Sequence, residues 1–457
     1  MMSTNENQLF RLMQKETDRF VREHPQSLSL HRQAQNSLIS GVPMNWMTKW
    51  AGGYPIYADH AKGSRVIDVD GHEYVDFCLG DTGAMTGHSP ERAIAAIMEQ
   101  VPRGLTLMLP TENAIWVATE MSKRFGLPYW QFTLTATDAN RFALRIARAV
   151  TGKNKVLVFN WCYHGTVDET FVTWNGEDAR ARKGNLGPAV DPATTTKVIE
   201  FNDLDALEQA LSQRDVACVL TEPVMTNIGI IHPDPGYHAA LRALTKKYDV
   251  LLIIDETHTI CTGPGGYTKE YGLNPDILTI GKAIASGIPA GAYGLSADIA
   301  ERLTHVLSSE ETDTSGIGGT LAGNALSLAA MRATLEHMLT PENFANAISM
   351  AKRFMHGIEE IISVHSLPWH VTHLGSRVEY LFQPTRPRNG AEAASLWNHD
   401  LDKFIHLYML NRGILLTPFH NMALMSPDTS TTDVNLHTDV FQEVVDVLIE
   451  QQCITSV

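Results

Sequence analysis

Short apolar runs alternate with helix-like segments through the middle of the chain. Apolar runs of four to eight residues between polar or turn residues are typical of buried strands, and apolar residues spaced three or four apart indicate amphipathic helices. These patterns predict strands at residues 155–160, 216–224, 250–257 and 277–284, with helices at residues 203–213 and 236–249. This alternation favours an α/β fold with a parallel, doubly wound sheet.

The pattern changes after about residue 320. Longer helical periodicities at residues 325–339, 343–364 and 396–413, with short strands between them, predict a second, smaller α+β domain. Near the N-terminus, alternating residues on both sides of Asp70-Gly71 predict a β-hairpin over residues 65–77. We therefore expect three parts: an N-terminal segment (residues 1–70), a large domain (71–319) and a small C-terminal domain (320–457).

Composition narrows the possible partners and location. The 457 residues carry a net charge of −15, which disfavours binding to nucleic acid and to anionic membranes. The chain shows no apolar signal core at its N-terminus and no run long enough to span a membrane. Five cysteines without a CxxC pair suit a reducing compartment, so we expect a cytosolic protein: Cys78, Cys162, Cys218, Cys261 and Cys453.

The apolar run at residues 250–254 ends at Asp255-Glu256, which places an acid at the edge of the sheet where open α/β folds bind ligands. A magnesium-binding strand of a nucleotide hydrolase would need a GxxxxGK[ST] loop. Gly281-Lys282 fails that pattern because Ala283 follows it and Asp276 occupies the first glycine position. The histidines at positions 365, 370 and 373 match neither one helical face nor a zinc pattern, so we expect no metal.

An organic cofactor explains the acid better. The strand predicted at residues 277–284 carries Lys282 near its end, and a buried lysine is costly in its charged form. A Schiff base with an aldehyde cofactor removes that cost. Asp255, one strand away, would then pair with the protonated nitrogen of a pyridine ring, so that the ring withdraws electrons from the substrate.

The sequence "IIDETHT…GLNPDILTIGKAIASGIPAGAYG" resembles the signature of class III aminotransferases, which are fold-type-I pyridoxal-phosphate enzymes. "TLTATDANRFALRIAR" (133–148) is similar to the family's phosphate loop, with Ala136 in place of glycine and Asp138 in place of glutamate. There the amides of Ala136 and Thr137 and the Thr137 hydroxyl would face the phosphate at a helix N-terminus. Asp138 is expected to act only as a first-turn helix acid.

Further matches follow in the family's order over roughly residues 36 to 450. The resemblance implies that Tyr163 of "CYHG" stacks on the cofactor ring and that Glu222 of "EPV" packs near the cofactor. Thr257 occupies the place where the family commonly has valine against the other ring face. Thr320 of "GIGGT" would bind the phosphate of the partner subunit, which implies a homodimer with shared active sites.

The substrate is predicted from missing arginines. Relatives bind a substrate carboxylate through an arginine near the N-terminus or in the C-terminal domain, but the corresponding places here offer Trp46 or Met47, and Thr417 or Phe419. An apolar pocket favours a primary amine as donor to a 2-oxo acid such as pyruvate, whose carboxylate would need Lys49, Arg377 or a backbone site. The alternatives are a β- or ω-amino-acid transaminase, a glutamate-1-semialdehyde aminomutase, and a silent relative that binds the cofactor without turnover.

Overall fold

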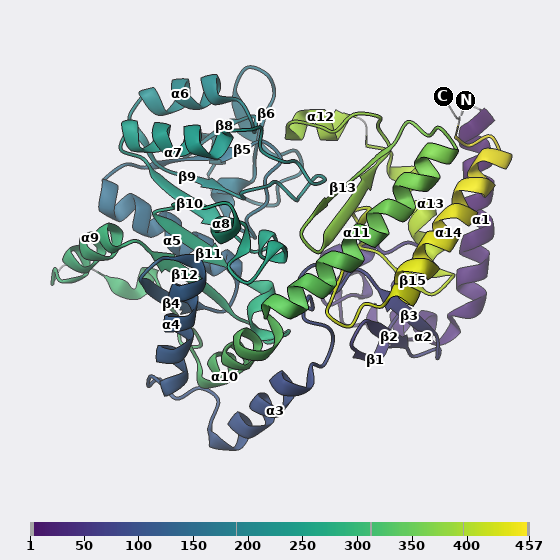
Figure 1. Ribbon diagram of the computed structural model, residues 1–457, viewed down its shortest axis with the longest axis horizontal. Coiled ribbons are helices and arrows are strands. Elements are labelled where there is room, and N and C mark those ends of the chain that lie inside the picture. The colour runs from purple at the N-terminus through teal and green to yellow at the C-terminus, as the bar shows by residue number, and fades with distance from the viewer. Residues whose placement is uncertain (1–3, 189, 311–312, 396, 455–457) are drawn as a thin grey trace. The chain divides into compact units, whose positions relative to one another are not determined.

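The computed structural model describes residues 4–188, 190–310, 313–395 and 397–454 (Figure 1). The chain divides into two compact units, each described by itself here. Unit 1 comprises residues 1–90, 345–386 and 396–457, and unit 2 comprises residues 91–344 and 387–395. The predicted division into an N-terminal segment, a large domain and a small domain, with boundaries after residues 70 and 319, stays a prediction.

Unit 2 is built on a seven-stranded sheet with the order β4-β12-β11-β10-β9-β5-β8. Its strands run parallel except β12, which is antiparallel to both of its neighbours. This confirms the predicted α/β class with a mostly parallel sheet. The strand bounds are β4 (Tyr129–Thr133), β5 (Lys155–Phe159), β8 (Thr196–Ile199), β9 (Val216–Thr221), β10 (Leu251–Asp255), β11 (Ile277–Ile280) and β12 (Gly291–Leu295).

The central strands of this sheet are buried on both faces. Every residue of β9, β10, β11 and β12 is buried, although successive side chains of a strand point to opposite faces. Continuous apolar runs without polar alternation are what such strands require, which is why the runs were recognisable in the sequence. The longer helices of unit 2 are α3 (Glu91–Gln100), α4 (Glu112–Phe125), α5 (Ala136–Thr151), α6 (Leu204–Ser212), α7 (Tyr237–Lys247), α9 (Ala297–Leu307) and α10 (Ala325–Ala333), and its shorter ones are α8 (Gly266–Glu270) and α12 (Gly390–Ser395).

The predicted elements of unit 2 are confirmed with shorter bounds. The four predicted strands contain β5, β9, β10 and β11, and the two helices between them are α6 and α7. β11 ends at Ile280, so Lys282 lies in a turn beyond the strand and not within it. The helix expected at residues 325–339 continues from α10 into a π-helical turn at Thr334–Met338.

Unit 1 contains two smaller sheets and four long helices. One sheet has the order β1-β2-β3-β15 and the other has the order β13-β14-β16. The strands are β1 (Ala58–Lys62), β2 (Arg65–Asp68), β3 (Glu73–Asp76), β13 (His370–Leu374), β14 (Arg377–Leu381), β15 (Ile414–Leu415) and β16 (Met422–Leu424). The long helices are α1 (Thr4–Glu23), α11 (Pro341–Val364, assigned to unit 1 from residue 345), α13 (His399–Leu410) and α14 (Thr431–Glu450), and α2 (Pro25–Ala34) is shorter.

The predicted N-terminal hairpin is confirmed. β2 and β3 pair antiparallel around a turn in which Gly71 has a φ of 89°, a conformation that costs glycine little. The Asp70 carboxylate accepts hydrogen bonds from the amides of Gln26 and Ser27 at 2.7 and 2.9 Å. It therefore satisfies free amides in the first turn of α2 and ties that helix to the hairpin.

The described residues contain one group that could hold a metal ion, formed by His24, Asp68 and His72 in unit 1. Hydrogen bonds already connect these side chains, since the Tyr74 hydroxyl lies 2.7 Å from His24 Nε2 and 2.8 Å from Asp68 Oδ2. The predicted absence of a metal stays a prediction.

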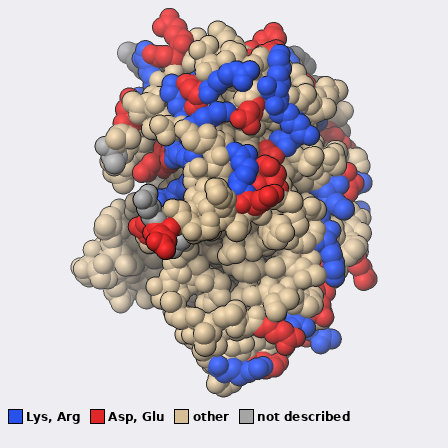
Figure 2. All heavy atoms as spheres, turned by 90° about the vertical axis from the view of Figure 1, so that its left-hand side faces the viewer, with Lys and Arg blue, Asp and Glu red and all other residues tan. Residues whose placement is uncertain are grey.

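Where charged side chains gather on the face shown in Figure 2, both signs lie side by side, and a broad part of that face carries uncharged residues. That arrangement lacks the continuous basic surface that phosphate backbones require. Among the residues that the structure describes, no helix combines the length and the apolar character needed to cross a bilayer.

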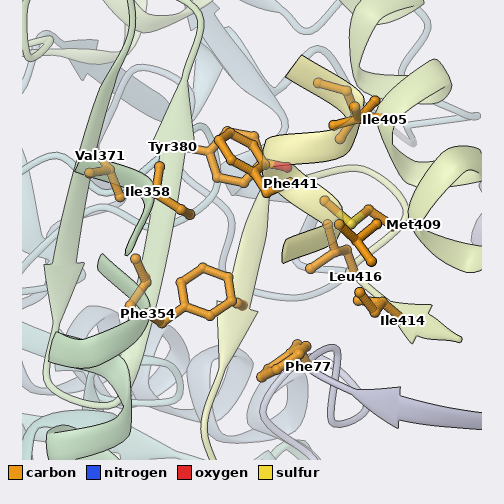
Figure 3. Packing of buried hydrophobic residues seen from close by; sticks show 14 of the residues in the cluster. Phe77, Phe354, Ile358, Val371, Tyr380, Ile405, Met409, Ile414, Leu416 and Phe441 are labelled. Carbon is orange, nitrogen blue, oxygen red and sulfur yellow. The ribbon is translucent and has the colours of Figure 1, made fainter. Parts of the chain in front are cut away.

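The hydrophobic core of unit 1 gives a stability prediction. Phe354 of α11 is fully buried, with its ring centroid 5.4 Å from that of Phe77 (Figure 3). Its ring centroid also lies 4.0 Å from that of His437. Phe354→Ala should lower the free energy of unfolding by about 3–5 kcal/mol, because it removes buried surface and leaves a cavity. Urea unfolding followed by circular dichroism measures this change.

Phe10→Ala is the matched control because Phe10 is 60% exposed, and it should change the free energy of unfolding by less than about 0.5 kcal/mol. Equal effects of the two substitutions would contradict the assignment of Phe354 to the core.

Candidate active site

The candidate residues of unit 2 gather at one edge of the seven-stranded sheet. β4, β5, β9, β10 and β11 run in the same direction, so their carboxyl ends meet at that edge, where open α/β sheets bind ligands. Each of these ends is followed by one part of the candidate site: the N-terminus of α5 after β4, Tyr163 after β5, Glu222 after β9, Asp255 at the end of β10 and Lys282 after β11.

Asp255 is held by three donors. His164 Nδ1 lies 2.9 Å from Asp255 Oδ2, the Asn140 side chain donates to the same oxygen at 2.8 Å, and the Thr257 amide donates to Oδ1 at 3.0 Å. Burial would raise the pKa of Asp255, but the hydrogen bond and the charge of His164 lower it below its usual value. The buried carboxylate therefore stays ionised and can hold a proton on a nitrogen base.

Asn140 fixes this arrangement by two further bonds. Its amide nitrogen also donates to the backbone carbonyl of His164 at 3.1 Å, and its amide oxygen accepts from the Thr279 hydroxyl at 2.6 Å. Asp255 and Thr279 are neighbours in the register of β10 and β11. The helix α5, the loop after β5 and two strands therefore determine the position of one carboxylate.

Lys282 begins the turn after β11 with a φ of 50°, a left-handed conformation that is uncommon outside glycine. Its Nζ lies 2.9 Å from His258 Nε2. The preceding residue, Gly281, packs against the start of α5, where an added Cβ would lie 2.8 Å from the backbone nitrogen of Ala136. Glycine is required at that position because α5 approaches so closely, and this contact sets the separation between Lys282 and the helix N-terminus.

The N-terminus of α5 offers an anion site. The Thr135 side chain accepts from the Asp138 amide at 3.1 Å and caps the helix, whereas the amides of Ala136 and Thr137 have no acceptor among the described residues. The Thr137 hydroxyl accepts from the Thr166 amide at 3.1 Å, which turns the loop after β5 toward the same place. Free amides and the helix dipole favour a phosphate there. Asp138 lies in the first turn, as expected.

The remaining cofactor candidates differ in burial. Tyr163 is 37% exposed and packs edge-on to Phe171 at a centroid distance of 6.4 Å. Burial raises the pKa of Glu222 to about 7, and Thr226 donates to its carboxylate through both amide and hydroxyl. Thr257 is buried, with a hydroxyl oxygen that has no partner among the described residues. Thr320 lies on an exposed turn.

The substrate candidates belong to unit 1. Trp46 and Phe419 pack edge to face at a centroid distance of 5.9 Å, and Lys49 Nζ lies 5.4 Å from the centre of the Phe419 ring. Thr417 is fully buried, with its hydroxyl 4.0 Å from Met422 Sδ, and Met47 is half-buried beside Trp46 in the turn Asn45–Lys49. The structure thus brings Trp46, Lys49 and Phe419 together, whereas Thr417 faces the interior.

Three residues with clear contacts were not among the predicted site residues: Asn140, His164 and His258. His164 directly follows Tyr163, and His258 lies three residues after Asp255, so both stand inside motifs that the sequence analysis quoted. Asn140 could have been found as a polar residue on the buried face of α5, beside Ala139 and Ala143. A buried polar side chain needs a partner, and here that partner is Asp255.

These residues fit the parts of pyridoxal phosphate. The α5 amides match its phosphate, Lys282 matches its aldehyde, and Asp255 matches its ring nitrogen. Two buried polar atoms without partners among the described residues, His164 Nε2 and Thr257 Oγ1, adjoin the Asp255 cluster and are consistent with a polar ligand beside it. When bound, the cofactor supplies an aldehyde that takes up an amine and a ring that withdraws electrons.

The sheet, the helix N-terminus, the acid and the lysine together define a pyridoxal-phosphate enzyme of fold type I. Residues 47–448 match the family described as aminotransferase class-III, and the chain belongs to that family. Its cofactor is pyridoxal 5′-phosphate, as expected from the resemblance.

Comparison with individual proteins gives finer likenesses. A glutamate-1-semialdehyde 2,1-aminomutase of Persephonella marina is 32% identical over 419 residues, covering 90% of this chain and 96% of that one. The crystal structure of a glutamate-1-semialdehyde aminomutase from Pseudomonas aeruginosa PAO1 is 48% identical with a TM-score of 0.94, covering 97% and 99% of the two chains. An omega-transaminase from Sphaerobacter thermophilus is 27% identical with a TM-score of 0.83, covering 92% and 97%.

The roles of Lys282 and Asp255 are testable by substitution. Lys282→Ala should abolish covalent trapping of the cofactor by borohydride and lower turnover by at least about 10³-fold, because the expected role of the lysine is both to link the cofactor and to move the substrate proton. Mass spectrometry of the reduced protein measures the linkage.

Asp255→Asn should retain the linkage but lose most activity, because a neutral amide no longer holds a proton on the ring nitrogen. Phe10→Ala serves as a distant control that should change neither readout. Unchanged turnover in Asp255→Asn would remove Asp255 from this role.

Proposed function

We propose that this chain is an aminomutase that converts glutamate-1-semialdehyde into its isomer by moving the amino group from C2 to C1. The observation that carries the proposal is the 48% identity over 97% of the chain to the Pseudomonas aeruginosa protein of that name. The Persephonella marina aminomutase supports it at 32% identity. The reaction is an isomerisation, so no external oxidant or amino acceptor is consumed.

The sequence analysis favoured an amine transaminase because both usual arginine positions hold other residues. The same analysis named Arg377 as one candidate for a carboxylate, and in the structure it is a buried arginine of β14. A carboxylate-bearing substrate is therefore compatible with the arginines that the chain does contain. The aminomutases carry an arginine at the position that Trp46 or Met47 occupies in this chain. The chain differs from them there, and the proposal does not explain this difference.

A second candidate is transfer of an amino group from a primary amine to a 2-oxo acid such as pyruvate. The edge-to-face pair of Trp46 and Phe419 favours it, because aromatic side chains suit an apolar amine. The similarity to an omega-transaminase also supports it. A third candidate is a β- or ω-amino-acid transaminase, whose amino donor carries a carboxylate. A relative that binds the cofactor without turnover is disfavoured because both Lys282 and Asp255 are retained.

The side chains would act alike in either reaction. Asp255, kept ionised by His164 and Asn140, holds the proton on the ring nitrogen. Lys282 would take a proton from the substrate carbon and return it two atoms away, on the other side of the amino nitrogen, in a 1,3-proton shift for which its amine must be neutral. His258, 2.9 Å from Lys282 Nζ, orients that amine.

A panel of substrates tests the choice of reaction. The purified holoenzyme should convert glutamate-1-semialdehyde to 5-amino-4-oxopentanoate without any added acceptor, at least about tenfold faster than it forms alanine from pyruvate and aliphatic or aryl-alkyl amines. Chromatography of both products in parallel reactions measures this ratio, with Lys282→Ala as the blank. The reverse ratio would favour the amine transaminase.

We also propose that the active unit is a homodimer in which Thr320 serves the phosphate of the partner subunit. Thr320 lies on an exposed turn beside Leu321, which is 48% exposed. The segment at residues 94–115 of unit 2 contacts the helix α10, which follows Thr320 in the sequence. This segment carries exposed apolar side chains that a second copy of the chain would cover. They are Ile94, Met98, Val101, Leu105, Leu107, Met108, Leu109 and Ile115.

Mixing two inactive variants tests the shared site. Lys282→Ala and Thr320→Asp are each expected to be inactive, the second because a carboxylate repels the phosphate. Hybrid dimers would contain one site with both native residues and should regain up to about a quarter of the wild-type activity. Mass spectrometry under native conditions checks that hybrids form, and proven hybrids without activity would place Thr320 in the site of its own subunit.

A further inference from the structure

Lys282 lies in contact with a second base. Its Nζ atom is 2.9 Å from His258 Nε2, a distance at which one nitrogen donates a hydrogen bond and the other accepts it. A lysine ammonium has donors only, so Nε2 accepts if the lysine is charged, whereas a proton on Nε2 requires a neutral amine. The two nitrogens therefore share one proton, and His258 is placed to take it from the lysine.

The loop that carries His258 is anchored by the residue two positions before it. Glu256 is fully buried, and its carboxylate accepts from the amide of Tyr267 at 3.2 Å and from the hydroxyl of Thr259. The amide of Ile260 donates to the carbonyl of Glu256 at 2.9 Å and closes a turn around His258. These bonds fix the backbone on both sides of the imidazole.

Two other histidines of unit 2 show the contrast. His164 faces the ionised carboxylate of Asp255 through Nδ1, and this carboxylate favours a protonated imidazole. His238 Nε2 lies 2.8 Å from the backbone carbonyl of Pro223, and because a carbonyl only accepts, this Nε2 must carry a proton. Neither of these ring nitrogens can take a proton from an amine, whereas Nε2 of His258 can.

We propose that His258 takes a proton from Lys282 while the lysine is free, and so prepares it to attack the aldehyde of pyridoxal phosphate. The need arises because an ordinary lysine is an ammonium at neutral pH, and its nitrogen then has no lone pair for the attack. The inference concerns the loading of the cofactor. It rests on the cofactor of the family and therefore holds for every reaction considered above.

The steps balance in atoms and electrons. The lone pair of Nζ forms a bond to the aldehyde carbon, and the π electrons of the carbonyl bond move to its oxygen. This oxygen takes one proton from Nζ and a second from the imidazolium of His258, and then leaves as water. The linkage keeps one proton on its nitrogen, and His258 returns to its neutral form. General acid–base assistance of this kind accelerates a step by about 10²- to 10⁴-fold.

The rate of cofactor loading tests this role without turnover. The full-length chain is freed of cofactor, mixed with excess pyridoxal phosphate, trapped with borohydride at successive times and analysed by mass spectrometry. His258→Ala should form the linkage about 10- to 100-fold more slowly than wild type, and added imidazole should raise its rate at least about fivefold while leaving wild type unchanged. His258→Gln, which keeps a hydrogen-bond acceptor but cannot take up the proton, should load as slowly as His258→Ala.

Two controls separate bond formation from folding and cofactor binding. Pyridoxamine phosphate has no aldehyde, so its dissociation constant, measured by calorimetry, should stay within about twofold of wild type in both His258 variants. His305→Ala, which removes an exposed histidine of α9, should load at the wild-type rate.

A wild-type loading rate in either His258 variant, or no effect of imidazole on His258→Ala, would overturn the proposal. A loss of pyridoxamine phosphate affinity as large as the loss of rate would also overturn it, because His258 would then serve cofactor binding. None of these results would bear on the aminomutase reaction, which the substrate panel tests on its own products.

Discussion

The ion pair between Asp255 and His164 is the interaction on which the rest of the active site depends. Burial alone would lower the pKa of His164, but the hydrogen bond with Asp255 helps to raise it to about 10. Two ionised groups are therefore buried together, which is costly unless hydrogen bonds satisfy them. Asn140 and the amide of Thr257 supply those bonds, and they come from a helix and from the end of β10. Because the carboxylate is fixed from several elements, the sheet order that brings these elements together is a condition for the chemistry.

Much of the fold could be predicted because unit 2 is built on fully buried strands. Continuous apolar runs such as residues 250–254 are typical of strands that are buried on both faces of a sheet, and the acid that ends this run lies at the edge of the sheet. The turn at Lys282 was less predictable. Lys282 has a left-handed backbone conformation, and the preceding Gly281 packs against the start of α5, which is a tertiary contact between segments far apart in the sequence.

The contacts of the site were harder to predict than its main residues. Asp255 and Lys282 can be recognised in the sequence as charged residues near the ends of apolar runs. The importance of Asn140 and His164 is visible only from their hydrogen-bond partners in the structure. Arg377 illustrates the same limit. In the sequence it is one cation in a short strand, and only the structure shows that it is buried and that its Nε and Nη1 atoms have no acceptor among the described residues.

The packing of Gly281 against Ala136 also bears on how the family can vary. Two backbones in direct contact leave no side chain between them that could be exchanged for a longer or shorter one. The spacing between Lys282 and the N-terminus of α5 therefore does not depend on which substrate the enzyme uses. Changes in substrate specificity must therefore arise in segments outside this contact. The residues proposed to bind the cofactor can stay constant while the residues that select the substrate diverge.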